Sequence, residues 1–153
     1  MDFYELLKED HRNIEKLLQA TEKARPHSEK HEELFLELIR EVRLHNYLEE
    51  LLVYPMLQEK AQTLDLSLES IEEHRIMQML LDEMEDVTTR DEQWAAKFQV
   101  FKEQIARHVR EEEEKTFPAA RKIFTNEQAE ELGARIMTEK ALQRAANPEP
   151  ITE

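Results

Sequence analysis

The sequence predicts an all-α protein, an antiparallel up-down-up-down four-helix bundle with a short fifth helix at the C-terminus. Two observations lead to this fold class. The 153 residues include one Gly and five Pro, and 37% are charged, which is typical of helices joined by few turns. Apolar residues also recur at intervals of three and four over nearly the whole chain. Four long helices with short connections favour an antiparallel bundle.

The four long helices each carry polar residues on an otherwise apolar stripe. In the first helix, His11 falls between Leu7 and Ile14 on one face. The second stripe consists of Phe35, Leu38, Val42, His45, Glu49, Leu52 and Met56. The third and fourth stripes consist of Ile71, His74, Met77, Leu81, Phe98, Phe101, Ile105, His108 and Glu112.

Breaks and caps divide these stripes. Breaks are expected at 25–28, near Glu59 and at 63–67, and capping boxes at Thr89 with Glu92 and at Thr125 with Gln128. We expect residues 1–124 to form the bundle, 125–146 to form a helix packed on it, and 147–153 to form a flexible tail. The apolar face of the fifth helix favours packing against the bundle or a second chain.

The charge and composition exclude several classes of protein. A formal net charge of −14 disfavours binding to nucleic acid or to an anionic membrane. The sequence has no Cys and shows neither a signal peptide nor a long apolar run, so we expect a cytoplasmic protein. Without Cys there is also no thiolate metal site.

The two halves of the chain repeat one design. A shift of 63 residues carries His45 onto His108, Glu49 onto Glu112 and His11 onto His74. It also carries Tyr54 onto Phe117 and Pro55 onto Pro118. Each half is therefore predicted to be a helical hairpin that offers one His from its first helix and His-x-x-x-Glu from its second.

The position of these polar residues predicts a metal centre. A carboxylate buried without a partner is very unfavourable, and the stripes offer no Lys or Arg near the middle of the helices. The candidate ligands, which should converge at mid-bundle within one or two helical turns, are His11, His45, Glu49, His74, His108 and Glu112.

This ligand set is too large for one tetrahedral zinc and suits two octahedral ions. With Glu49, Glu112 and an oxo or hydroxo group bridging, each ion would have about five of six ligands and an open position for a small molecule. We expect two iron ions, with manganese as the second choice and zinc as the third.

The motifs also resemble a known family. The order DHR, His-x-x-x-Glu before Tyr-Pro, EHR, and His-x-x-x-Glu before Phe-Pro is similar to the hemerythrin-like, or HHE cation-binding, domain over residues 1 to about 124. The resemblance implies a four-helix bundle with a non-haem di-iron centre and the same six ligands. The Glu-x-x-His motif of ferritin-like bundles is absent.

Two departures from this pattern bear on function. Oxygen-carrying hemerythrins have a fifth His and a closing His-x₄-Asp, where this chain has Gln78 and Glu112. The resemblance then favours chemistry with hydrogen peroxide, O₂ or NO, including catalase-like peroxide decomposition, over reversible O₂ carriage. Whether the protein is an enzyme stays open.

Three other functions stay open beside this one. They are a storage or sensing module for O₂ or iron, a structural bundle that holds zinc or no metal, and an oxidase acting on an organic substrate, for which no pocket is identified. The oligomeric state is also open.

Several further residues lie near the proposed centre or at the helix ends. Glu15 and Gln78 lie one turn beyond His11 and His74 and could reach the open side of the centre, although surface positions are more typical. For Tyr54, packing is favoured over a role at the site. Expected roles of the others are an apolar wall for Ile14 and Met77, a kink or helix end for Pro55 and Pro118, surface or capping positions for His27 and His31, and a core position for Trp94.

Overall fold

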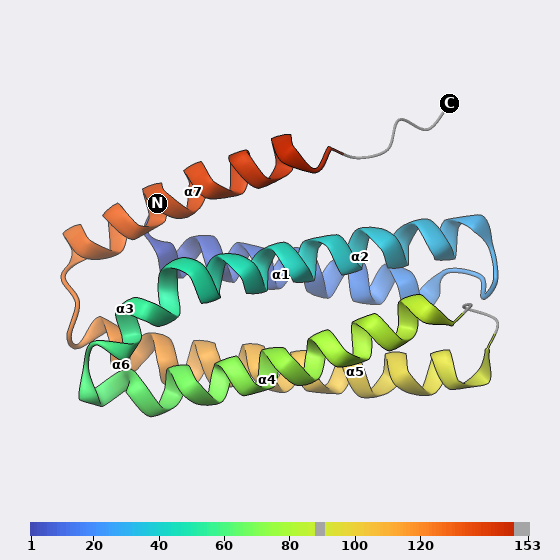
Figure 1. Ribbon diagram of the computed structural model, residues 1–153, viewed down its shortest axis with the longest axis horizontal. Helices are drawn as coiled ribbons and strands as arrows, with labels where there is room; N and C mark the ends of the chain where they lie inside the picture. Colours follow the sequence, from blue (N-terminus) through green and yellow to red (C-terminus); the bar gives the residue numbers. More distant parts are fainter. Residues whose placement is uncertain (88–90, 149–153) are drawn as a thin grey trace.

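A computed structural model describes residues 1–87 and 91–148, and these residues form helices and no strand (Figure 1). The π-helical turns are written η. In chain order the elements are α1 (Phe3–Lys23), α2 (Glu29–Leu48), η1 (Glu49–Val53), α3 (Tyr54–Gln58), α4 (Ala61–Asp86), α5 (Glu92–Glu111), η2 (Glu112–Thr116), α6 (Phe117–Arg121) and α7 (Asn126–Ala146).

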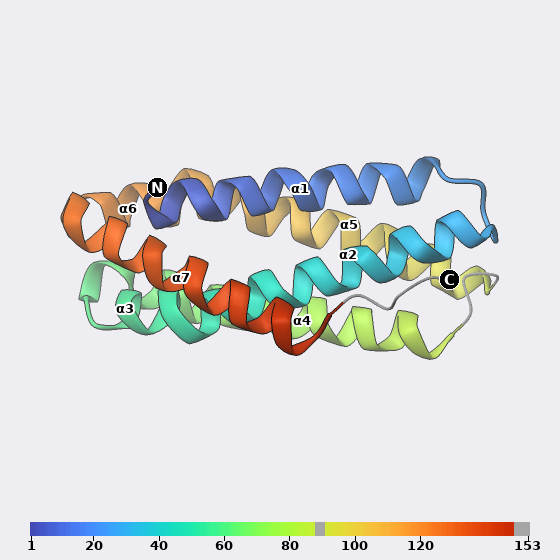
Figure 2. The same cartoon turned by 90° about the horizontal axis from the view of Figure 1, so that it is seen from above.

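The four long helices form two antiparallel hairpins, which confirms the predicted bundle. The hairpin of α1 and α2 lies above the hairpin of α4 and α5 in Figure 1. Helix α7 then crosses the outer side of the first hairpin and contacts α1 and α2 (Figure 2). With 21 residues, α7 is as long as α1, so the fifth helix is not short.

Side-chain caps set several of the helix starts. The predicted break at 25–28 is confirmed, and Ser28 caps α2 by accepting a hydrogen bond from the His31 N–H (3.1 Å). The capping box at Thr125 is present at the start of α7. The one expected at Thr89 lies outside the described residues; α5 begins after Asp91, which accepts from the Gln93 N–H (2.7 Å).

The prediction of a loop at 63–67 is wrong, because α4 already begins at Ala61. The chain turns at Lys60, whose backbone is extended and which directly precedes α4. Small polar residues suggested a turn, but their hydroxyls bond to helix-end or helix-interior carbonyls instead. Thr63 Oγ1 donates to Leu57 O (2.6 Å), and both Thr63 and Ser67 are buried.

A π-helical turn follows each second helix, where the sequence predicted a kink or an end. The Tyr54 N–H donates to Glu49 O, and the Phe117 N–H donates to Glu112 O, so both bonds span five residues. Each helix therefore continues into a short α-helical segment with Pro near its start. Such turns insert one extra residue and are frequent at functional sites.

The core consists of two hydrophobic clusters. One lies toward α3, α6 and α7 and includes Leu7, Leu48 and Phe117. The other extends toward the far end of the bundle and includes Ile14 and Met77. A layer of buried polar residues lies between them, and its members are candidate site residues.

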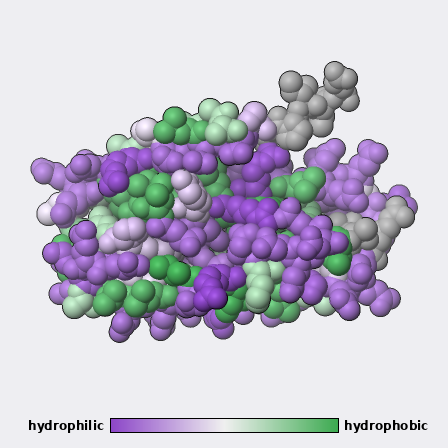
Figure 3. Space-filling view, in the orientation of Figure 1, coloured by the Kyte–Doolittle hydropathy of each residue, from purple (hydrophilic) through white to green (hydrophobic). Residues whose placement is uncertain are grey.

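The surface is predominantly polar on the face shown in Figure 3, where hydrophobic residues are scattered among hydrophilic ones. None of the helices in residues 1–87 and 91–148 combines the length and hydropathy needed to cross a membrane.

Candidate metal centre

All six predicted ligands come together in the buried polar layer, and none is more than 4% exposed. Their donor atoms form two groups, in each of which one atom per residue lies within 4.8 Å of the others. Glu49 belongs to both groups. The first group is His11, His45, Glu49 and Glu112, and the second is Glu49, His74 and His108.

The two hairpins supply matching pairs of imidazoles. The rings of His11 and His45 have centroids 4.9 Å apart at an interplanar angle of 66°. Those of His74 and His108 are also 4.9 Å apart, at 64°. The 63-residue repeat in the sequence is therefore a repeat in three dimensions at the site.

The two inner carboxylates reach both imidazole pairs. Glu49 Oε1 lies 2.9 Å from His45 Nε2 and 3.4 Å from His74 Nε2. Glu112 Oε1 lies 3.2 Å from His11 Nε2, and its Oε2 lies 3.6 Å from His108 Nε2. Each glutamate begins a π-helical turn, which follows directly on the helix that carries its His.

Several inner atoms are fully buried and have no hydrogen-bond partner within residues 1–87 and 91–148. They are His11 Nε2, His45 Nε2, both Glu49 oxygens and Glu112 Oε1. Some lie close together, but contact alone does not give them hydrogen-bond geometry. Buried polar atoms without partners are costly, and nitrogen and oxygen atoms that converge on one point fit metal ligation. The donor set thus fits a metal-binding role.

A carboxylate lies on the outer nitrogen, Nδ1, of each of the four imidazoles. The pairs are His11 with Glu113 (2.8 Å), His45 with Asp10 (3.0 Å), His108 with Glu73 (3.1 Å) and His74 with Glu50 (3.3 Å). Such partners fix the tautomer and orientation of a metal-binding imidazole, so that Nε2 faces the metal. All four pairs obey the 63-residue shift.

The surrounding charges set the protonation of the site. Burial alone would lower the pKa of His108, but Glu49, Glu73 and Glu112 raise it to about 10. For Glu49, burial opposes ionisation, yet the charge of His45 and contacts with other imidazoles hold its pKa well below the usual range. The polypeptide therefore balances the buried negative charge with protons on the imidazoles, a place that a cation could take.

Helix α7 contributes a lysine that binds one of the outer carboxylates. Lys140 Nζ donates to Asp10 Oδ1, while Asp10 Oδ2 faces His45. Burial would raise the pKa of Asp10, but His45 and Lys140 lower it overall. One charge on α7 is thus connected to an inner imidazole through a single carboxylate.

Tyr54 breaks the symmetry between the two halves. Its hydroxyl donates to Glu112 Oε2 (2.9 Å) and lies 3.2 Å from His74 Nε2. Burial and the charges of Glu112 and Glu49 raise its pKa well above 10, so the hydroxyl stays protonated. At the matching position, Phe117 packs with its ring parallel to His11. The expectation that Tyr54 serves only for packing is therefore wrong.

The remaining candidates lie outside the ligand groups. Glu15 is exposed and belongs to neither ligand group, and Gln78 donates to Asp82 (2.7 Å). Ile14 and Met77 are buried next to the polar layer, as expected.

Two aromatic expectations have different outcomes. Trp94 is in the core, as predicted. The prediction of a surface or capping position for the His31 side chain is wrong. His31 is buried, with its ring against the Trp94 indole, and burial lowers its pKa. His27 is exposed in the first loop, with a positive φ of 69°.

Sequence reasoning missed the four outer carboxylates. Asp10 and Glu73 directly precede His11 and His74, and Glu50 and Glu113 directly follow Glu49 and Glu112. The shift of 63 residues aligns them as acid with acid, and that agreement was the available signal.

Comparisons with known proteins agree with this geometry. The family model for the hemerythrin HHE cation binding domain matches residues 2–120. A crystal structure of a hemerythrin HHE cation binding domain-containing protein from Mycobacterium kansasii is similar, with a TM-score of 0.85 and 28% sequence identity. The match covers 95% of this chain and 89% of that one. A search of the curated proteins finds no significant match. The chain belongs to the hemerythrin HHE cation-binding domain family.

Proposed function

We propose that this protein holds two iron ions at the six inner ligands and binds O₂, hydrogen peroxide or NO there, with decomposition of peroxide as its reaction. The observation that carries the proposal is the pair of overlapping ligand groups that share Glu49. One group alone would serve one ion, whereas two groups that share a carboxylate suit two ions bridged by it.

Iron is the first choice because the donors are imidazole nitrogens and carboxylate oxygens without sulfur. Manganese and zinc are the second and third choices. When bound, the iron pair would supply the redox chemistry for 2 H₂O₂ → O₂ + 2 H₂O, which needs no further oxidant or reductant.

The side chains have separate tasks in this proposal. The outer carboxylates orient the imidazoles, and Glu49 and Glu112 provide the negative charge that holds two cations. Tyr54 donates its O–H to Glu112 Oε2 and so holds one inner carboxylate in place. Ile14 and Met77 exclude water on one side of the layer.

Reversible binding of O₂ or NO, for carriage or sensing, is the second candidate. It is favoured by the apolar surroundings of the centre, since buried hydrophobic clusters lie on both sides of the polar layer. The two candidates differ in what happens to the ligand. Peroxide decomposition releases O₂ with turnover, whereas a binding protein forms a lasting coloured adduct.

The test uses iron-loaded protein mixed with hydrogen peroxide in an oxygen electrode, with Tyr54→Phe and Glu112→Ala alongside. We expect O₂ release by the wild type, slower release by Tyr54→Phe with its iron retained, and none by Glu112→Ala. A stable coloured adduct without O₂ release would favour the second candidate. Iron-loaded protein that gives neither response would contradict both.

A further inference from the structure

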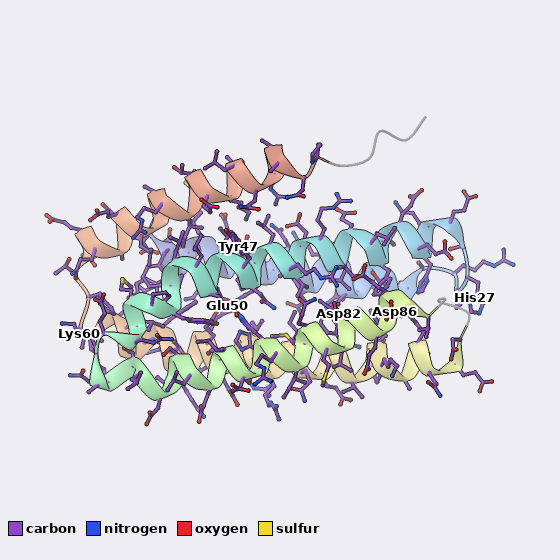
Figure 4. All side chains as sticks on the ribbon, viewed as in Figure 1. His27, Tyr47, Glu50, Lys60, Asp82 and Asp86 are labelled. Carbon is purple, nitrogen blue, oxygen red and sulfur yellow. The ribbon has the colours of Figure 1, made fainter. Side chains whose placement is uncertain are left out.

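A cleft opens between the second helix of the first hairpin and α4, beside the candidate metal centre. It has a volume of about 490 Å³, and His74 lies at its inner end. Glu50 and Tyr47 also line it. Figure 4 shows Glu50 between the two helices. The cleft therefore approaches one of the six inner ligands from solvent.

Glu50 is the outer carboxylate that lines this cleft, next to His74. Its side chain is 46% exposed, compared with 33% for Glu113, 16% for Glu73 and 8% for Asp10. Its 3.3 Å contact with Nδ1 of His74 is also the longest of the four. Of the four outer carboxylates, Glu50 can swing away at the smallest cost.

Asn46 gives the cleft a neutral polar side chain on its α2 wall. Its side chain is 5% exposed and lines the cleft. An amide on the wall of a cleft can both donate a hydrogen bond to a ligand and accept one from it. Gln78 adds a second amide, held beside the cleft by its bond to Asp82 (2.7 Å).

The corresponding positions of the other half lack these amides. The shift of 63 residues relates Asn46 to Val109 and Gln78 to Glu15. Two neutral hydrogen-bonding groups on one side thus correspond to an apolar side chain and an acid on the other. The two halves share their inner ligands but differ in this approach to them.

We propose that the cleft between α2 and α4 is the entry site for small uncharged ligands such as hydrogen peroxide and NO. Asn46 and Gln78 receive the ligand by hydrogen bonds, and Glu50 moves aside to admit it to the His74 side of the centre. The proposal rests on the proposed function, because it needs a metal centre at which the ligand arrives. It states from which side the ligand enters. The inner ligands alone do not indicate this side, because the two halves of the centre are nearly symmetric.

The test fills the cleft with an indole and uses the other half as a matched control. Gln78→Trp and Glu15→Trp are loaded with iron(II), and the association rate of NO is measured by stopped-flow absorption under anaerobic conditions. We expect Gln78→Trp to keep its iron and to bind NO about tenfold more slowly, within the range by which association rates vary among variants. Glu15→Trp should bind NO at the wild-type rate.

Glu50→Ala tests the opposite change, because it widens the cleft instead of filling it. Removing the outer carboxylate should speed NO association, and Glu113→Ala should speed it less. If Gln78→Trp fails to fold, Leu51→Trp fills the same cleft from the exposed side and Glu114→Trp is its control.

Two outcomes would overturn the entry site while leaving the proposed function standing. One is a wild-type rate of NO association in a folded variant whose cleft is filled. The other is an equal slowing of NO association by Gln78→Trp and Glu15→Trp. A wild type that takes up neither iron(II) nor cobalt(II) would instead contradict the proposed function itself.

Discussion

At the scale of single residues, the inner and outer groups of the centre differ in how they can be recognised. His45 and Glu49 are conspicuous because polar residues on an apolar stripe need a reason to be buried. Asp10 sits beside a ligand in a chain rich in acids, so its contact with His45 is evident only in the structure. The inner set could therefore be predicted, whereas the outer set was marked in the sequence by nothing stronger than acids that align with acids under the 63-residue shift.

The outer carboxylates should differ in their effect on metal affinity. Asp10→Asn should lower iron affinity about tenfold to a hundredfold, because a buried charge that orients His45 is removed. Glu50→Gln should have a smaller effect, since its partner contact is longer and exposed to water. Competition with a chelator measures both, and equal affinities of the two variants would contradict this ranking.

The hydroxyl of Tyr54 should contribute to the stability of the metal-free protein. Tyr54→Phe leaves Glu112 Oε2 without its 2.9 Å donor, which should cost about 1–3 kcal/mol. The phenyl ring fits the fold, because Phe117 occupies the matching place. Urea unfolding of both proteins without metal provides the measurement. An unchanged free energy of unfolding would show that the hydrogen bond contributes nothing.

At the scale of helices, the π-helical turns and α7 are the features that periodicity could not predict. Apolar spacing indicates which residues face the core, but it does not contain the switch from four- to five-residue hydrogen bonds at Glu49 and Glu112. The packing of α7 across the first hairpin was one of two options left by its apolar face. Its ion pair with Asp10 had no signal in the sequence.

The single glycine of the chain lets α7 approach the N-terminus closely. A Cβ at Gly133 would lie 2.4 Å from Met1 O and 3.1 Å from Asp2 C. In a free helix Gly→Ala stabilises by about 1 kcal/mol. Here the contact with backbone should reverse the sign, so that Gly133→Ala destabilises by about 1–3 kcal/mol.

Thermal unfolding checks this expectation, with Glu131→Ala as a control on the exposed side of α7. The control should stay within about 0.5 kcal/mol of the wild type. A more stable Gly133→Ala variant would mean that α7 is not held against the N-terminus.

At the scale of the whole molecule, the internal repeat explains why so much of the fold was predictable. Two hairpins of one design place their polar residues at the same level along the bundle axis. The alignment of His11 with His74 by the 63-residue shift therefore indicated one shared centre. The helix connections were less predictable. Polar residues such as Thr63 are common both in loops and in buried helix starts, and burial decides between them.

The metal-free molecule should lose stability as the pH rises. The folded pKa of His108 is raised to about 10 and that of His45 is also raised, although burial opposes both. The stabilisation from these protons is complete below the unfolded value of about 6.5 and is lost as the pH rises toward about 10.

The lowered pKa of Glu49 acts in the opposite direction, because its stabilisation is lost only as the pH falls below the usual carboxyl range. Chelator-treated protein should therefore be most stable between about pH 4.5 and 6.5. Melting temperatures measured from about pH 3 to about pH 10 test the expectation. A metal-free protein that becomes more stable between pH 6.5 and 10 would contradict it.

The central claim is that the two hairpins together hold a pair of iron ions, and iron content by mass spectrometry tests it most directly. Protein reconstituted anaerobically with iron(II) and then desalted should contain about two iron ions per chain, as two ligand groups sharing Glu49 require. Glu49→Ala should lose most of both ions. A content of one or none in the wild type, or full content in Glu49→Ala, would contradict the account.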